Sequence, residues 1–195
     1  MTKIITMIIF GLILTIPSQL NSSFNVSIGI PISNAFGDIT DQWDDDGHGK
    51  SMFAGFQIGV SYVRYYTNNI VLFEPGLRFI SRGHDFSCDI CGDGTVVVNS
   101  IDAFLNIKFN TNRTGDYKPF SFYPYIGFAP SFNVSFSGDD EEHFNDNSMY
   151  LLLGTDLLFR ERFALGIEYN IGLNSILKDL EMFYNTMMMS VKWRF

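Results

Sequence analysis

The segment from Phe163 to Asn174, FALGIEYNIGLN, decides the fold of this chain of 195 residues. Its odd-numbered positions are all large and apolar, whereas its even-numbered positions are all small or polar. An uninterrupted period of two predicts a β-strand with one apolar and one polar face. The segment is longer than the usual strand of a soluble protein and matches a tilted strand that crosses a bilayer. It therefore predicts a transmembrane β-strand.

Further segments repeat this alternation, and the connections between them are alternately long and short. The predicted strands are residues 24–36, 52–66, 70–83, 95–110, 120–137, 148–159, 163–174 and 185–195. An even number of strands and this asymmetry of the connections are typical of outer-membrane barrels. The predicted fold class is therefore all-β, an eight-stranded antiparallel up-and-down transmembrane β-barrel.

The composition agrees with a barrel wall and excludes a helical membrane protein. Aromatic residues make up 16% of the chain and charged residues only 17%, against about 25% charged residues in a typical soluble domain. No interior apolar run is long enough for a membrane-spanning helix. A lipocalin-like barrel and a two-sheet sandwich are the soluble alternatives. Two features favour the membrane barrel: the polar faces carry small residues, and the apolar faces end in aromatic residues. These aromatic residues are Tyr62, Tyr66, Tyr169 and Trp193.

The N-terminal segment is a different kind of sequence. Lys3 supplies a positive charge, residues 4–17 are an apolar stretch, and the polar segment SQLNSS follows. This layout predicts a signal peptide, residues 1–22, ahead of an outer-membrane β-barrel domain, residues 23–195, with cleavage within SQLNSS. An uncleaved membrane anchor is the alternative, for which the apolar stretch is short.

Charged residues on the polar faces of the predicted strands are nearly balanced in sign. The interior of an eight-stranded barrel is just wide enough for side chains to fill, and unpaired charges there would be costly. These residues therefore predict an ion-pair network in the lumen rather than a water-filled pore, with a proton or ion path as the alternative. The predicted members are Glu74, Arg78, Arg82, Asp102, Lys108, Asp156, Glu168, Lys192 and Arg194.

The net charge of −8 is concentrated in the four long connections, whose only basic residues are Lys50 and Lys178. Because the long loops of such barrels face outward, an acidic outer rim is predicted. Such a rim repels nucleic acid, and its carboxylates are candidate ligands for divalent cations. Acidic residues that merely keep the loops solvated are the alternative. The spacing in residues 37–51 does not match an EF-hand, so no metal site is assigned.

Cys88 and Cys91 are the only cysteines of the chain. In an exported protein they predict a local disulfide that stiffens the second long loop. There are two alternatives. One is a zinc site formed together with His84 and Asp93, and the other is a free dithiol.

All three histidines are predicted to lie in long loops. Some outer-membrane barrels are acyltransferases or proteases with His, Asp and Ser residues at the outer rim, and Asp46, His48 and Ser51 are the residues that would fill such roles here. Their spacing is not diagnostic, and such residues are ordinary in loops. The protein is therefore predicted not to be an enzyme and to carry no cofactor, with a rim-located enzyme as the alternative.

Several segments resemble the PorT-like or OmpX-like outer-membrane β-barrel family that is common in Bacteroidetes. FEPGLRFISRG (73–83) is the most specific of them. The others are PISNAFGD (31–38), IDAFLNIKF (101–109), YPYIGFAPSF (123–132), GTDLLFRERFALGIEYNIGLNSI (154–176) and KWRF (192–195). The resemblance implies an eight-stranded outer-membrane barrel and fixes no activity. One branch of the family serves protein secretion.

The C-terminus resembles the assembly signal that the barrel-insertion machinery reads, with Val191, Trp193 and Phe195 on one face. Together these features predict an integral outer-membrane protein with a filled lumen and a structural, adhesive or assembly role. An accessory role in protein secretion, a rim-located enzyme and a soluble ligand-binding barrel are the alternatives. The expected partners are outer-membrane lipid and the barrel-assembly machinery, with secretion-system proteins as partners in the accessory role.

Overall fold

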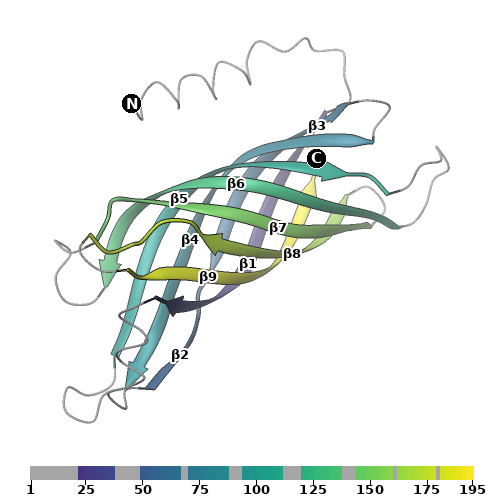
Figure 1. Cartoon of the computed structure of the whole chain (residues 1–195). Helices are drawn as coiled ribbons and strands as arrows, with labels where there is room; N and C mark the ends of the chain where they lie inside the picture. The colour runs from purple at the N-terminus through teal and green to yellow at the C-terminus, as the bar shows by residue number, and fades with distance from the viewer. Residues whose placement is uncertain are drawn as a thin grey trace.

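The computed structural model describes residues 22–37, 49–66, 70–87, 94–111, 120–137, 144–159, 162–178 and 181–195. These residues form one antiparallel sheet that closes into a barrel (Figure 1). Its strands are β1 (Ser22–Phe36), β2 (Gly49–Ala54), β3 (Gln57–Tyr66), β4 (Val71–Ser87), β5 (Gly94–Phe109), β6 (Phe120–Ser137), β7 (Asn147–Phe159), β8 (Phe163–Gly172) and β9 (Phe183–Arg194). The ring closes where β1 pairs with β9. No helix among the described residues is long and apolar enough to cross a bilayer.

The strands β2 and β3 together form one of the eight members of the ring, because both pair with β1 in a single register. They are interrupted opposite Pro31, which accepts a hydrogen bond of 2.8 Å from the N–H of Gly55 but has no N–H to donate in return. On the other side, residues 52–57 lie opposite residues 80–84 of β4. Residues 52–57 contain one residue more than the segment of β4 that they face, and this extra residue makes a β-bulge where β2 and β3 are interrupted.

Large apolar side chains point outward around the whole ring. In β8, exposed and buried residues alternate from Phe163 to Asn170, and Ile167 is 50% exposed. Every strand contributes to this outer surface, with Ile28, Met52, Ile58, Leu77, Leu105, Ile126, Leu153, Ile167 and Met189. A lipocalin-like barrel would hide this face around a ligand, so the alternative of a soluble lipocalin-like barrel is wrong.

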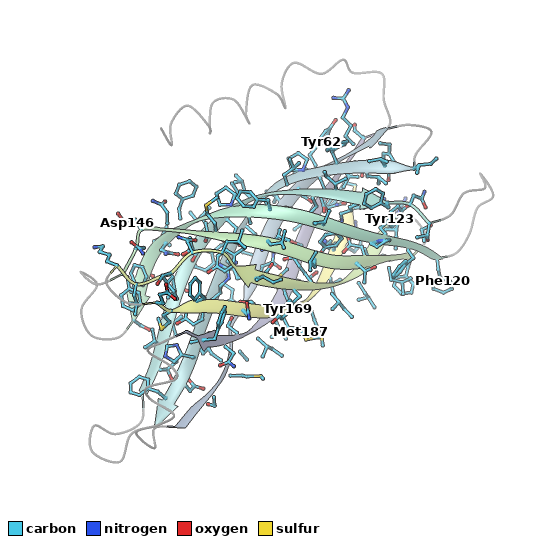
Figure 2. The ribbon with its side chains drawn as sticks, viewed as in Figure 1. Tyr62, Phe120, Tyr123, Asp146, Tyr169 and Met187 are labelled. Atoms are coloured by element: carbon cyan, nitrogen blue, oxygen red, sulfur yellow. The ribbon has the colours of Figure 1, made fainter. Side chains whose placement is uncertain are left out.

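Aromatic pairs lie on the outer surface toward both ends of the barrel. At the end with the short turns, which we call the short-turn end, Phe163 contacts Trp193 with ring centroids 4.3 Å apart. At the opposite end, the long-loop end, Phe36 stacks on Phe183 at 5.2 Å. Figure 2 shows the two ends, with Asp146 at the long-loop end and Phe120 at the short-turn end. Such aromatic belts are typical of the two interfaces of a membrane.

A second bulge turns the end of β6. The pairing of β6 with β5 shifts by one residue at Val134, so that the residues beyond it change faces. Phe136 lies opposite the buried Val98 and stacks on Phe144, with ring centroids 4.4 Å apart. Uniform alternation along residues 120–137 predicts that Phe136 lies on the outer face with Val134, and the bulge makes that prediction wrong.

The sheet formed by β2, β4, β5 and β6 projects at the long-loop end, where β2 pairs with β4 as far as Ser87 and β5 pairs with β6 as far as Ser137 (Figure 1). Several of its outward residues there are polar and bond across the strands: Thr95 donates to Asp85 at 2.6 Å, and Asn99 donates to Ser135 at 2.9 Å. Because β4 continues to Ser87, His84 lies in a strand. The prediction that this histidine lies in a loop is therefore wrong.

Candidate functional site in the barrel lumen

Two arginines of β4 and a carboxylate of β5 form the first half of a buried charged cluster, which we call the arginine half. Asp102 Oδ2 lies 2.6 Å from Arg82 Nη2 and 2.9 Å from Arg78 Nε. Arg78 also reaches across the ring, where its Nη1 lies 2.5 Å from Oε1 of Glu168 in β8. The Arg82 guanidinium stands 4.1 Å from the centre of the Tyr150 ring. The arginine half thus ties opposite walls of the barrel.

The second half of the cluster, the lysine half, is built around Lys108. Its Nζ lies 2.6 Å from Glu74 Oε2 and also pairs with Asp156 of β7. Asp156 in turn binds Lys192 of β9, with Nζ and Oδ1 2.9 Å apart. Glu74 accepts a further hydrogen bond of 2.9 Å from Asn25 Nδ2 of β1. Strands from around the ring therefore meet in this half.

The charges of the cluster balance. Among the described residues, the salt bridges join four carboxylates to four basic side chains: Glu74, Asp102, Asp156 and Glu168 with Arg78, Arg82, Lys108 and Lys192. Tyr125 lies where the two halves approach each other, because its hydroxyl donates to Glu168 at 2.9 Å and its ring centre lies 5.0 Å from Lys108 Nζ. Buried ions need this compensation, since removing one partner leaves an unpaired charge away from water.

One member of the predicted network, Arg194, makes a different set of contacts. Its Nη1 donates to the Tyr65 hydroxyl at 2.7 Å, and its Nε donates to Asn25 Oδ1 at 3.3 Å. It lies closer to the short-turn end than Lys192, since both belong to β9 and Arg194 ends that strand. It therefore joins the cluster through neutral groups.

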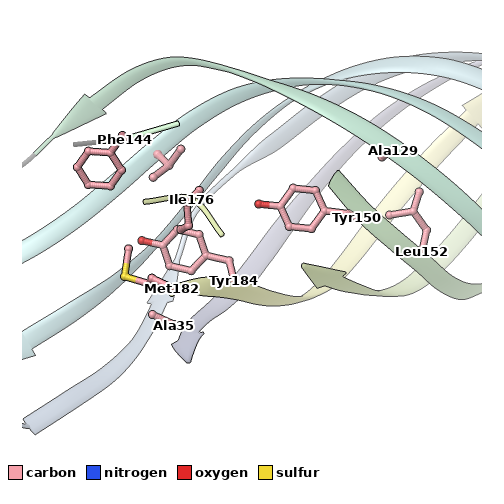
Figure 3. Packing of buried hydrophobic residues seen from close by; sticks show 9 residues of the cluster. Ala35, Ala129, Phe144, Tyr150, Leu152, Ile176, Met182 and Tyr184 are labelled. Atoms are coloured by element: carbon pink, nitrogen blue, oxygen red, sulfur yellow. The ribbon is translucent and has the colours of Figure 1, made fainter. Parts of the chain in front are cut away.

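Apolar side chains close the lumen on both sides of the charged cluster. Toward the short-turn end, the buried residues are Val63, Leu72, Tyr123, Leu158 and Ala164. Toward the long-loop end, they are Ala35, Val98, Ala129, Phe144, Tyr150, Leu152, Ile176, Met182 and Tyr184 (Figure 3). These layers were missed from the sequence, although apolar residues on the polar parity, such as Leu72 and Leu152, are the signal that could have revealed them.

Two loop segments complete the apolar layer at the long-loop end, and together they form a lid (residues 144–146 and 175–178). Phe144 and Leu177 form an isolated β-bridge. Asn145 fixes the two segments, since its backbone N–H donates to Ile176 O at 2.7 Å and its Nδ2 donates to the carbonyls of Ser175 and Leu177 at 3.0 and 2.8 Å. The lid therefore closes the mouth through backbone pairing and one asparagine side chain.

Replacing Asn145 with alanine is expected to loosen the lid, because two carbonyls of the facing segment lose their donor. We expect the free energy of local opening to fall by about 1–3 kcal/mol, measured as faster hydrogen exchange of the Ile176 amide, which donates to Met182 O at 2.8 Å. The control is Asn147→Ala, at an exposed position at the start of β7. Equal exchange rates in the two variants would contradict this function of Asn145.

His84 lies inside the barrel, with 1% of its surface exposed. Its Nδ1 is 2.9 Å from the hydroxyl of Tyr184. The other histidines, His48 and His143, lie outside the described residues, as do the cysteine pair and residues 1–21. The predicted disulfide and signal peptide therefore stay predictions. In the part of the chain that the structure describes, no group of His, Cys, Asp and Glu could hold a metal ion.

The predicted assembly residues lie on the outer surface beside the seam between β1 and β9. Val191, Trp193 and Phe195 are all exposed. Phe195 N–H donates to Phe24 O at 2.8 Å, and Phe24 N–H donates back at 3.3 Å. The C-terminal residue thus takes part in closing the ring, and its function as an assembly signal stays a prediction.

Comparison with known proteins agrees with this architecture. Residues 8–195 match the family described as outer membrane protein beta-barrel domain. The structure is similar to neisserial surface protein A (NspA), with a TM-score of 0.57 and 14% identity over 90% of this chain and 99% of that one. It is also similar to the outer membrane protein OprG from Pseudomonas aeruginosa, with a TM-score of 0.52 and 12% identity over 90% and 97%. No curated protein sequence matches. These similarities confirm the predicted ring of eight antiparallel strands.

Proposed function

Because the chain belongs to the outer membrane protein beta-barrel domain family, we propose that it is a non-conducting and non-catalytic barrel that works through its outer surfaces. Its location is the outer membrane. The role that we propose is structural, adhesive or assembly-related. Its partners in this proposal are outer-membrane lipid around the wall and the barrel-assembly machinery during insertion.

The filled lumen is the observation that carries this proposal. A hydrated ion that entered the lumen would meet an apolar layer, then paired charges, then a second apolar layer. Eight strands leave an interior that side chains can fill completely. Conduction needs a path along which ions bind and leave easily, and the paired side chains occupy that path.

The position of His84 supports the non-catalytic part of the proposal. A nucleophile and its base must lie where a substrate can reach them. His84 is instead bonded to Tyr184 beneath the lid. The alternative catalytic residues Asp46 and His48 lie outside the described residues, so a rim-located enzyme remains the competing hypothesis.

The resemblance to PorT-like proteins supports the barrel more than it supports a secretion role. The most specific matching segment, residues 73–83, carries Glu74, Arg78 and Arg82, and all three are buried in the charged cluster. Buried side chains cannot recognise a secretion partner at the surface. We therefore rank the accessory role in secretion below the structural, adhesive or assembly role. Binding of divalent cations by the acidic rim is ranked below that role as well.

Purified protein inserted into a planar lipid bilayer is expected to give no channel openings, because paired side chains fill the lumen. The measurement is the single-channel current under an applied voltage, with a known porin as positive control for the bilayer. The Asn145→Ala variant should also remain silent, since the charged cluster lies beneath the lid. Stable, reproducible openings of the wild-type protein would contradict the proposed function.

A further inference from the structure

A small cavity lies at the junction of the two halves of the charged cluster. Its volume is about 10 Å³, which is room for roughly one water molecule. The arginine half contributes Arg78 and Glu168 to its lining, and the lysine half contributes Lys192. The rest of the polar lining is Ser27, Gln57, Asn106 and Ser190. The cavity therefore lies among groups that can donate and accept hydrogen bonds.

Gln57 has an unsatisfied amide atom beside this cavity. The side chain is 2% exposed, and its Nε2 donates to Ser27 Oγ at 2.9 Å. Its Oε1 is buried without a hydrogen-bond donor in the described residues. This amide oxygen therefore requires one more donor.

Asn106 presents the same problem with a fixed orientation. Its Nδ2 donates to Glu74 Oε2 at 3.3 Å, and an ionised carboxylate can only accept. The amide oxygen of Asn106 must therefore be Oδ1, which is buried without a donor among the described residues. Two side chains that line one cavity thus lack a partner, and leaving such groups unsatisfied is costly.

We propose that the cavity is a binding site for a single internal water molecule that links the two halves of the charged cluster. The chemistry of the lining selects a neutral occupant. A cation would lie beside Arg78 and Lys192, whereas an anion would lie beside the Glu168 carboxylate and the amide oxygens of Gln57 and Asn106. Water can donate to an amide oxygen of the lining and accept from Arg78 or Lys192.

The test is a crystal structure of the detergent-solubilised full-length protein, with separate soaks in rubidium chloride and sodium bromide. We expect a density peak within hydrogen-bond distance of Gln57 and Asn106, without anomalous signal in either soak. Absence of a peak would overturn the proposal. An anomalous rubidium or bromide signal in the cavity would also overturn it, because the site would then bind an ion.

Two variants sharpen this test. Gln57→Met removes the amide at similar length, and the water peak is expected to be lost. Ser33→Ala is the matched control, since Ser33 bonds Thr186 at 3.0 Å elsewhere in the interior, and the peak is expected to remain. A peak that persists unchanged in Gln57→Met would contradict the assigned contacts. The soaks of the wild-type protein decide the outcome even if a variant fails to fold.

Discussion

Replacing Asp102 with leucine is expected to destabilise the barrel by about 3–5 kcal/mol. The carboxylate holds both Arg78 and Arg82, and all three side chains are almost completely buried. Its removal leaves two guanidinium groups without their shared carboxylate, while Arg78 keeps its ion pair with Glu168 and a hydrogen bond to Asn170 Oδ1. The measurement is urea unfolding in lipid vesicles, followed by tryptophan fluorescence.

Two further variants separate the charge effect from a general loss of packing. Asp85→Leu removes a carboxylate on the projecting sheet that accepts from Thr95, and it should cost only about 1 kcal/mol. Combining Asp102→Leu with Arg82→Met should recover part of the lost stability, because Arg78 keeps Glu168 and the second guanidinium left without a carboxylate is removed. Equal effects of Asp102→Leu and Asp85→Leu would contradict a buried charged cluster.

Replacing Ile167 with arginine is expected to cost about 2–4 kcal/mol, the effect of a basic residue on the lipid face near the bilayer midplane. Ile167 is half-exposed in the middle of β8 and lies between Thr155 and Met189 on the neighbouring strands. The same unfolding experiment in lipid vesicles measures the effect. In a soluble protein, arginine at such an exposed position would be tolerated.

The matched control for this variant is Ser135→Arg. Ser135 is exposed on the projecting sheet, where Asn99 donates to it, so a charge there should cost about 0–1 kcal/mol. Equal stabilities of the Ile167→Arg and Ser135→Arg proteins would mean that lipid does not surround the middle of the wall.

The fold could be predicted because a period of two survives wherever the strand register is regular. The prediction from alternation failed where the strand register shifts. The bulge at Val134 turns Phe136 inward, and Pro31 divides the predicted second strand into β2 and β3. Sequence alternation contains no count of the residues on the partner strand, so it cannot show where two residues oppose one.

The members of the charged cluster could be predicted from parity and charge, but their partners could not. Arg78 and Glu168 belong to strands on opposite walls, and their contact depends on how the closed ring brings those walls together. Arg194 has the right parity, but it ends β9 and contacts Tyr65 instead of a carboxylate. Depth along the barrel axis decides such partners, and a single strand does not reveal it.

The closed, membrane-embedded barrel is tested most directly by heat-modifiability on a denaturing gel, with protein extracted from outer membranes. Closed barrels with complete strand pairing and cross-ring ion pairs should resist detergent until heated. We predict that the unboiled protein migrates faster than the boiled protein. Recovery of the protein in the soluble periplasmic fraction, with no difference in migration, would contradict a lipid-facing barrel wall.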